Sequence, residues 1–253
     1  KCGGSVLVDN ELFNIFIKDI SVLNKLGFIP IIVHGGGKRI SNKLNELGIK
    51  SNFIKGLRVT EKETIEVVEQ VLIEFNSEII EALKEQQCDS QTINSRENNI
   101  MTVVQENTEL GFVGTPSNIN KSIIDKIVDE KKVPVIAPLG LDENNQTYNI
   151  NADTAAGAIA KKIEARRLII MSDVEGVLDS NKKLIPEINS ESINELINGE
   201  IVTGGMIPKI NNCLDVASNG VKGVVIIDGR KNHSLLFELL SDKGSGTLIR
   251  QWK

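Results

Sequence analysis

The sequence has few of the residues that several protein classes require. Its three cysteines, Cys2, Cys88 and Cys213, form no Cys-x-x-Cys pair, and its two histidines, His34 and His233, are far apart in the 253-residue chain. A disulfide framework, a structural zinc site and a metal-hydrolase site are therefore not indicated, and the expected compartment is the reducing cytoplasm. No apolar run reaches the ~20 residues that span a bilayer, so we expect no membrane segment.

Positive charge is not in surplus either. Lys and Arg number 29 against 34 Asp and Glu, which gives a formal net charge of −5. Nucleic-acid binding depends on clustered positive charge, so DNA and RNA are not expected partners. The remaining composition, 25% charged and 40% hydrophobic, is typical of a globular chain, and its length allows one or two domains.

Apolar runs alternate with helical patterns, which predicts an α/β fold built on a mainly parallel sheet. Helices are expected over 11–26, 60–86, 123–130, 154–164, 192–197, 207–218 and 234–240, and from the glycine turn at 35–37 to Gly48. Strands are expected over 28–33, 98–105, 110–113, 133–137, 167–171 and 224–227. The segments 98–105 and 110–113 are predicted to form a hairpin. We find no linker, so any two lobes should share a continuous sheet, with a boundary near 164–167.

Glycines gather at three inferred turns near helix starts, namely Gly3-Gly4, Gly35-Gly36-Gly37 and Gly204-Gly205. Backbone amides at such a turn can approach an anion closely, and the helix dipole favours negative charge there. The alternative is that the glycines merely end strands, and a single cluster fits both interpretations. Three clusters together favour a phosphate site.

The common nucleotide-binding motifs do not explain these glycines. A Walker A loop needs glycine where Ile32 stands, and Ser or Thr where Arg39 stands. A dinucleotide fingerprint starting at Gly35 would need Gly or Ala in place of Ile40. Three basic residues do lie beside glycine turns: Lys1, Arg58 and Lys209. Each taken singly is more often a solvated surface group.

A series of motifs extends along nearly the whole chain. The motifs are Lys1-Cys2-Gly3-Gly4, Val33-His34-Gly35-Gly36-Gly37, Gly56-Leu57-Arg58-Val59-Thr60, Asn149-Ile150-Asn151-Ala152-Asp153, Ser172-Asp173-Val174-Glu175-Gly176-Val177, Gly205-Met206-Ile207-Pro208-Lys209, Ile227-Asp228-Gly229-Arg230 and Gly246-Thr247-Leu248-Ile249. In this order they are similar to the motifs of the acetylglutamate kinases within the amino acid kinase superfamily. Gly-Leu-Arg-Val-Thr and Asn-x-Asn-Ala-Asp are the most specific of them. Position 204 is Gly, where the pattern often has an acidic residue.

The resemblance implies a three-layer α/β/α sandwich that transfers the γ-phosphate of ATP to the side-chain carboxylate of N-acetyl-L-glutamate. It implies a lobe over 1–165 for the acyl amino acid and dimerisation, and a lobe over 166–253 for ATP. It also implies a cytoplasmic homodimer, with Mg²⁺ held mainly by ATP and water rather than by a protein metal site. The chain begins at Lys1, and we expect preceding residues to form most of a first strand. Arginine-inhibited members carry an extra N-terminal helix, which is not visible here, so we expect insensitivity to arginine.

The resemblance also implies residue roles. Lys1 and Lys209 would stabilise the transferring phosphoryl group, and Asp153 would hold both ammonium groups. Gly3, Gly4 and Gly36 would bind phosphate; Gly36, Gly37, Arg58 and Asn149 would bind the acyl amino acid. The nucleotide would lie against Asp173, Val174, Glu175, Gly176, Val177, Leu178, Ile201, Val202 and Thr203.

Alternatives remain for these residues and for the function. On sequence alone Asp153 could equally be a helix N-cap, Asn149 a turn residue and Arg58 a surface cation. We favour a structural hydrogen-bonding role for His34 and inert thiols for the cysteines. The alternative functions are a related kinase with another carboxylate or carbamate acceptor, and a noncatalytic nucleotide-binding regulator.

Overall fold

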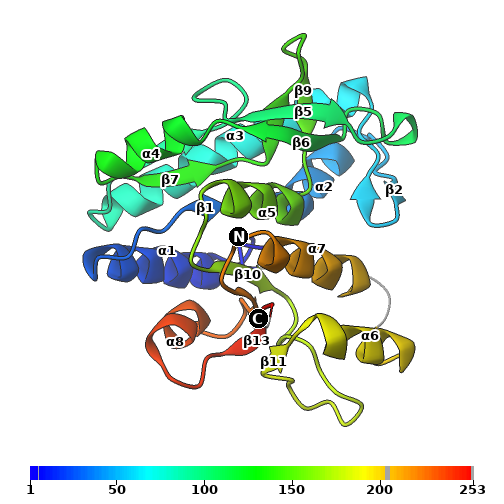
Figure 1. Cartoon of the computed structure of the whole chain (residues 1–253). Helices are drawn as coiled ribbons and strands as arrows, with labels where there is room; N and C mark the ends of the chain where they lie inside the picture. Colours follow the sequence, from blue (N-terminus) through cyan, green and yellow to red (C-terminus); the bar gives the residue numbers. More distant parts are fainter. Residues whose placement is uncertain (5, 203–205, 252–253) are drawn as a thin grey trace.

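The structure is a computed structural model that describes residues 1–4, 6–202 and 206–251 (Figure 1). Its helices are α1 (Asn10–Lys25), α2 (Gly37–Glu46), α3 (Lys62–Glu85), the short 3₁₀ turn η1 (Thr108–Leu110), α4 (Lys121–Asp129), α5 (Ala152–Lys162), α6 (Ser190–Asn198), α7 (Met206–Ser218) and α8 (Ser234–Leu240). Its strands are β1 (Ile32–Val33), β2 (Phe53–Ile54), β3 (Leu57–Arg58), β4 (Ser90–Ile93), β5 (Met101–Gln105), β6 (Gly114–Ile119), β7 (Val133–Ile136), β8 (Leu139–Leu141), β9 (Thr147–Asn149), β10 (Leu168–Ser172), β11 (Glu187–Ile188), β12 (Val224–Asp228) and β13 (Gly246–Ile249). Among the described residues, we find no helix with the length and apolarity needed to cross a bilayer.

The residues around Cys2 join two sheets into one. One sheet has the order β1-β7-β4 and the other the order β10-β12-β13-β11. Cys2 forms parallel bridges to His34, just after β1, and to Met171 in β10. Its backbone N–H donates to Val33 O at 2.9 Å, and Met171 N donates to Lys1 O at 3.0 Å. The two halves of the chain therefore share a continuous sheet, as predicted, in which only the β12–β13 pair is antiparallel.

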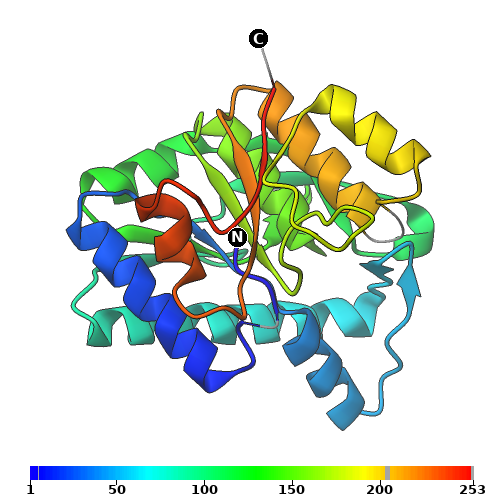
Figure 2. The same cartoon turned by 90° about the horizontal axis from the view of Figure 1, so that it is seen from below.

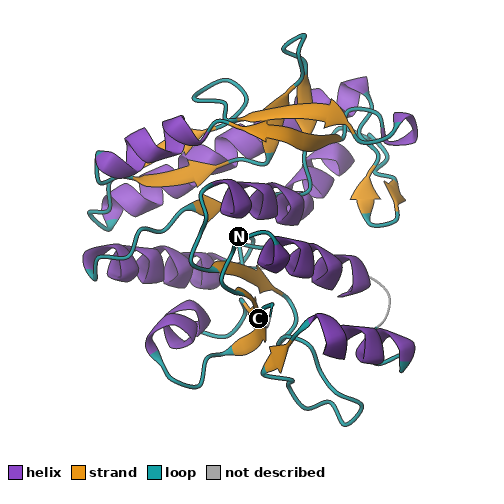
Figure 3. Ribbon diagram, in the orientation of Figure 1, coloured by secondary structure: helices purple, strands orange, loops and turns teal. Residues whose placement is uncertain are grey.

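Helices cover both faces of this sheet, because its strands are apolar on both faces (Figures 2 and 3). In β12, Val224 and Ile226 pack into one buried cluster, which also contains apolar residues of α4, α5, α6 and α7. Val225 and Ile227 pack into a second cluster, with residues of α1, α3 and α8. The alternation along one strand thus produces three layers and confirms the predicted α/β/α sandwich.

The predicted helices are confirmed, but three predicted strands were wrong at their bounds. The strand expected over 98–105 begins at Met101. The expected strand over 28–33 is reduced to Ile32–Val33, since Pro30 has no N–H for a ladder and Ile29 is 64% exposed. The hairpin exists, but its second strand is Gly114–Ile119 rather than 110–113. The backbone of 110–113 pairs with Thr60 instead. The Thr60 N–H donates to Leu110 O, and the Thr60 carbonyl accepts from Phe112 N.

Candidate active site

A cleft with a volume of 620 Å³ opens where three parallel segments end: Cys2, β1 and β10. The carboxyl edge of a parallel sheet is where α/β folds bind ligands. It brings together most of the predicted site residues. Among those lining the cleft are Lys1, Gly3, Gly4, Gly36, Gly37, Arg58, Asn149, Asp153, Asp173 and Lys209.

Asp153 lies in the first turn of α5 and binds two ammonium groups. Its Oδ1 lies 2.8 Å from Lys1 Nζ, and its Oδ2 accepts a hydrogen bond from Lys209 Nζ at 2.7 Å. All three side chains are mostly buried, with exposed fractions of 11% for Lys1 and 18% for the other two. The carboxylate thus links Lys1, next to the Cys2 segment of the sheet, to Lys209 near the start of α7.

The charge state of Asp153 follows from these contacts. Burial alone raises the pKa of this carboxyl, but the adjacent Lys1 and Lys209 ammonium groups outweigh it and lower the pKa to about 2. Asp153 is therefore ionised at neutral pH. It is suited to holding two cations rather than to accepting a proton as a general base.

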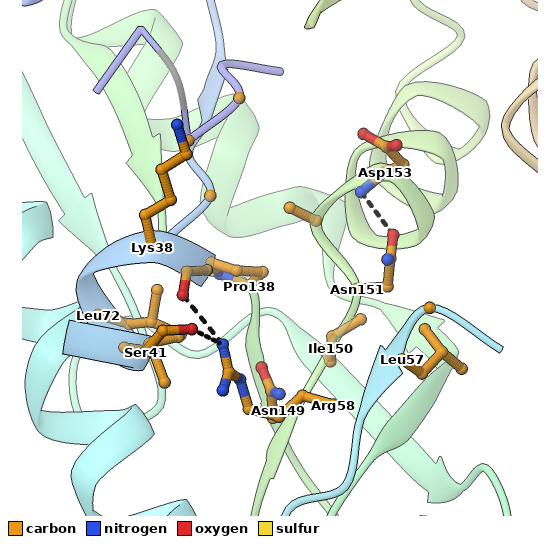
Figure 4. A pocket seen from close by; sticks show the side chains of 18 of the residues that line it. Lys38, Ser41, Leu57, Arg58, Leu72, Pro138, Asn149, Ile150, Asn151 and Asp153 are labelled. Atoms are coloured by element: carbon orange, nitrogen blue, oxygen red, sulfur yellow. Dashed lines mark hydrogen bonds between the residues drawn. The ribbon is translucent and has the colours of Figure 1, made fainter. Parts of the chain in front are cut away.

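The N-cap of α5 is Asn151, not Asp153. The Asn151 side-chain oxygen accepts from the backbone N–H groups of Asp153 and Thr154, at 2.9 and 3.2 Å (Figure 4). The alternative that Asp153 caps the helix is therefore wrong. The cap uses the free amides of this helix start and leaves the Asp153 carboxylate available to the lysines.

The start of α2 is different, because its N-cap, Gly36, has no side chain with which to satisfy the first amides. A methyl group on Gly36 would lie 2.5 Å from Leu72 Cδ2, so the buried Leu72 side chain would have to move to admit it between α2 and α3. A methyl group on Gly37 would meet no atom within 4 Å. The first turn of α2 therefore opens onto the cleft with room for an anion, and no side chain among the described residues caps its N–H groups.

Gly3 and Gly4 also differ. A methyl group on Gly3 would lie 2.6 Å from the Met171 carbonyl oxygen, so glycine lets the segment around Cys2 approach β10. A methyl group on Gly4 would lie 3.9 Å from Lys38 Cγ and 4.0 Å from Lys38 N, which is ordinary van der Waals contact. Gly4 thus has the more open backbone of the two.

Arg58 is 7% exposed and is held at the start of α2. Its Nη2 donates to Gly37 O and to Ser41 Oγ, both at 2.9 Å (Figure 4). Its Nη1 donates to Ser51 Oγ. Burial lowers the pKa of this guanidinium from its usual value. The hydrogen-bond acceptors are all neutral, so Arg58 presents a positive charge that no carboxylate balances within the described residues.

Asn149 lies at the end of β9 beside Arg58. Its Nδ2 donates to Thr60 Oγ1 at 3.3 Å, and Thr60 Oγ1 donates to the Arg58 carbonyl at 3.1 Å. The Thr60 hydroxyl thus connects the Asn149 side chain to the backbone of Arg58. Asn149 and Arg58 form one end of the cleft.

The predicted nucleotide segment is only partly at this cleft. Asp173 lines it, whereas 174–178, Ile201 and Val202 do not. Val177 and Val202 are buried in the core, and Glu175 pairs with Lys231 at 3.1 Å on the surface. Thr203 and the Gly204-Gly205 pair lie outside the described residues. The nucleotide roles of these residues stay predictions.

His34 and the cysteines are built into the core. Burial lowers the pKa of His34 to about 4, so the ring is neutral; its Nε2 lies 3.2 Å from Asn76 Nδ2, and its Nδ1 lies 3.3 Å from Gly35 O. All three cysteines are buried free thiols, and burial raises the pKa of Cys2 and Cys213 to about 12. These features support the predicted structural role of His34 and the predicted inert thiols.

Sequence reasoning missed three residues of the site. Asn151 caps α5, Ser41 braces Arg58, and Lys38 lines the cleft next to Gly4. Asn151 carried a recognisable signal, an Asn directly before a helix start. Ser41 carried none, because its partner is distant in the sequence.

Comparisons with known proteins give a consistent family assignment. The family model described as amino acid kinase family matches residues 1–228. The chain is 72% identical over 251 residues to an acetylglutamate kinase of Pelagibacter ubique (strain HTCC1062), covering 99% of this chain and 87% of the relative. It is 41% identical over 263 residues to an acetylglutamate kinase of Rhodospirillum centenum (strain ATCC 51521 / SW), covering 98% and 86%.

Solved structures share the fold at lower identity. An N-acetylglutamate synthase from Neisseria gonorrhoeae, complexed with coenzyme A and N-acetyl-glutamate, superposes with a TM-score of 0.89 at 21% identity, covering 100% of this chain and 58% of that one. A carbamate kinase from Giardia lamblia bound to AMP-PNP gives a TM-score of 0.71 at 13% identity, covering 99% and 97%.

Proposed function

Because the chain belongs to the amino acid kinase family, we propose that its cleft aligns ATP with an acyl amino acid along the two helix starts. The activity is that of an acetylglutamate kinase: the γ-phosphate of ATP passes to the side-chain carboxylate of N-acetyl-L-glutamate, in arginine biosynthesis. The products are ADP and N-acetyl-L-glutamyl 5-phosphate. A carboxylate is ionised at neutral pH, so the acceptor needs no general base. The enzyme has to position the reactants and stabilise charge.

One observation carries the proposed mechanism: Asp153 holds the ammonium groups of Lys1 and Lys209 at 2.8 and 2.7 Å at the edge of the cleft. Phosphoryl transfer spreads negative charge over the equatorial oxygens of the transferring group. Two ammonium groups fixed in advance stabilise that charge without reorganising during the reaction. Asp153 acts as their positioning residue.

The glycine turns bind the phosphate, and the Arg58 end of the cleft binds the acceptor. Gly4, Gly36 and Gly37 offer backbone amides to the phosphoryl group and substrate at the open start of α2. Arg58 binds a carboxylate of N-acetylglutamate, and Asn149 hydrogen-bonds the same molecule. The buried position of Arg58 and its neutral partners support this assignment.

Mg²⁺ is proposed to arrive as part of the MgATP substrate. Among the described residues, no group of three His, Cys, Asp or Glu side chains is placed to hold a metal ion. Mg²⁺ typically keeps several waters and binds through nucleotide phosphates, to which it supplies charge neutralisation. The cytoplasmic homodimer, the lobes over 1–165 and 166–253, and insensitivity to arginine stay predictions.

The decisive experiment measures ADP release with N-acetylglutamate, glutamate, aspartate and carbamate as acceptors. We expect strong turnover only with N-acetylglutamate. A preference for another acceptor would favour a related kinase, and nucleotide binding without turnover would favour a noncatalytic regulator. Light scattering on the same preparation tests the dimer.

A further inference from the structure

Lys38 brings a positive charge to the cleft that no hydrogen bond or ion pair among the described residues uses. Four basic side chains line the cleft: Lys1, Lys38, Arg58 and Lys209. Lys1 and Lys209 pair with Asp153, and Arg58 donates to a carbonyl and two hydroxyls. Within the described part of the chain, Lys38 has no hydrogen-bond or ion-pair partner. Its charge is available to a bound anion.

The backbone around Lys38 places that charge beside the glycine turns. Lys38 lies in the first turn of α2, directly after the uncapped Gly36-Gly37 start. A methyl group on Gly4 would lie 3.9 Å from Lys38 Cγ and 4.0 Å from its backbone N, so its stem runs along the Gly4 turn. A ligand that contacts the amides of both turns therefore lies within reach of this ammonium group.

The direction of the side chain separates it from the acceptor end. In Figure 4, Lys38 extends from the start of α2 toward the N-terminal segment, whereas Arg58 and Asn149 lie on the other side of that start. Asp153, which holds the two ammonium groups, is across the opening from Lys38. Lys38 thus lies on the side of the α2 start that carries the N-terminal segment, away from the acceptor end.

We propose that Lys38 binds the β- and γ-phosphates of ATP, from the side of the cleft opposite Lys1, Asp153 and Lys209. This inference rests on the proposed function, because it requires the triphosphate to lie along the glycine turns. MgATP and N-acetylglutamate each carry about two negative charges at neutral pH. The cluster of Lys1, Asp153 and Lys209 supplies a net charge of +1, and the negative charge of Asp173 offsets it. An unpaired cation on the phosphate side therefore complements the negative charge of the ligands. An exposed lysine on a flexible stem contributes mainly to binding affinity rather than to the alignment of the reaction.

The test compares Lys38→Met, Lys38→Arg and the control Lys43→Met by calorimetric titration with AMP-PNP and with AMP, both in the presence of Mg²⁺. Lys43 lies on the same helix but pairs with Glu46 on the surface at 3.2 Å. We expect Lys38→Met to weaken AMP-PNP binding about tenfold, the effect of one charge-assisted hydrogen bond. AMP affinity should not change, Lys38→Arg should retain most of the AMP-PNP affinity, and Lys43→Met should match the wild type.

Three results would overturn the proposal. Equal losses for AMP-PNP and AMP would indicate a structural effect. An increased KM for N-acetylglutamate with unchanged nucleotide affinity would place Lys38 at the acceptor. Unchanged affinity and kinetics would mean that Lys38 contacts neither. The titrations need no turnover, so a wild-type protein that binds AMP-PNP but does not phosphorylate N-acetylglutamate would contradict the proposed function and not this inference.

Discussion

Two helices begin at the edge of the same cleft and present it with opposite chemistry. The start of α5 has its amides satisfied by the Asn151 side chain, and it contributes the charged side chain of Asp153. The start of α2 has a glycine cap and contributes backbone N–H groups. One helix start acts through a side chain and the other through the main chain.

The difference shows how a helix N-terminus can be assigned to one task. A helix dipole favours an anion at its positive end. At α5 that anion is the protein's own Asp153, which is therefore able to collect cations. At α2 the place is left to a ligand. Each of the following predictions alters one of these starts and leaves the other unchanged.

The largest effect is expected from Lys209→Ala and Asp153→Asn. Removing a fixed contact to the transferring group should lower kcat by roughly 10²- to 10³-fold. The double variant should be little worse than the more damaging single change, because the residues act together. The control is Lys161→Ala, which breaks an exposed 2.6 Å pair with Asp215 between the same two helices. A near-normal kcat for Lys209→Ala, with only an increased KM for ATP, would make Lys209 a binding residue.

The second prediction uses the pH dependence of stability. The pKa of Asp153 is lowered from 3.8 to about 2, so its ionised form stabilises the fold fully above pH 4 and loses this effect as the pH falls toward 2. The shift corresponds to about 2 kcal/mol. Urea unfolding of wild type and Asp153→Asn should give a difference in unfolding free energy that shrinks by this amount between pH 4 and 2. A constant difference would contradict the coupling of Asp153 to its lysines.

At α2, Gly36→Ala and Gly37→Ala form a matched pair. The new methyl group collides with Leu72 at position 36 but meets open space at position 37. Gly36→Ala should reduce the free energy of unfolding by about 1 to 3 kcal/mol, as overpacking does. Gly37→Ala should leave it nearly unchanged. Equal destabilisation in thermal melts would show that the close approach of α2 and α3 does not depend on Gly36.

Arg58→Ala tests the acceptor end of the α2 start. Losing a guanidinium that matches carboxylate geometry should raise the KM for N-acetylglutamate about tenfold or more, with the KM for ATP nearly unchanged. Arg96→Ala serves as the control, since Arg96 is 64% exposed and pairs with Glu69. An effect confined to the KM for ATP would exclude the assignment.

The smallest effect is expected at the cap of α5. Asn151→Ala removes an acceptor for two backbone N–H groups and should cost about 1 kcal/mol of stability. Asn120 holds the same position at α4 but makes no side-chain cap, so Asn120→Ala should cost less. Urea unfolding of both variants measures the two losses of stability. A larger loss for Asn120→Ala would contradict the prediction.

Much of the fold could be predicted from the sequence because local pattern determines it. The Leu and Ile residues of α1 recur at helical spacing and are consistent with one buried helix face. The alanines of α5 are consistent with a buried face in the same way. The displaced hairpin strand could not be predicted, because the competing partner of residues 110–112 is Thr60, far away in the chain. Strands as short as β1 carry too few residues for a periodic signal.

The site was predictable where residue type and order carry the chemistry. Lys1, Asp153 and Lys209 were named from a motif order, and the structure brings them into contact. Asn151 was missed as the cap of α5, because Asn151 and Asp153 are both good caps and only the helix start at Ala152 decides between them. Lys38 was missed because an exposed lysine has no pattern of its own until its neighbour Gly4 is placed.

The segment around Cys2 also determines when the middle of the sheet can close during synthesis of the chain. Lys1 N donates to Ile169 O across 168 positions of sequence, and Cys2 bridges β1 and β10. The middle of the sheet therefore cannot close until the ribosome has released β10. Such distant pairing delays folding, since the entropy of closing the chain is lost before the contact forms. Because Lys1 is on this segment, closure of the sheet also places Lys1 beside Asp153, and the catalytic cluster is complete once Lys209 of α7 joins them.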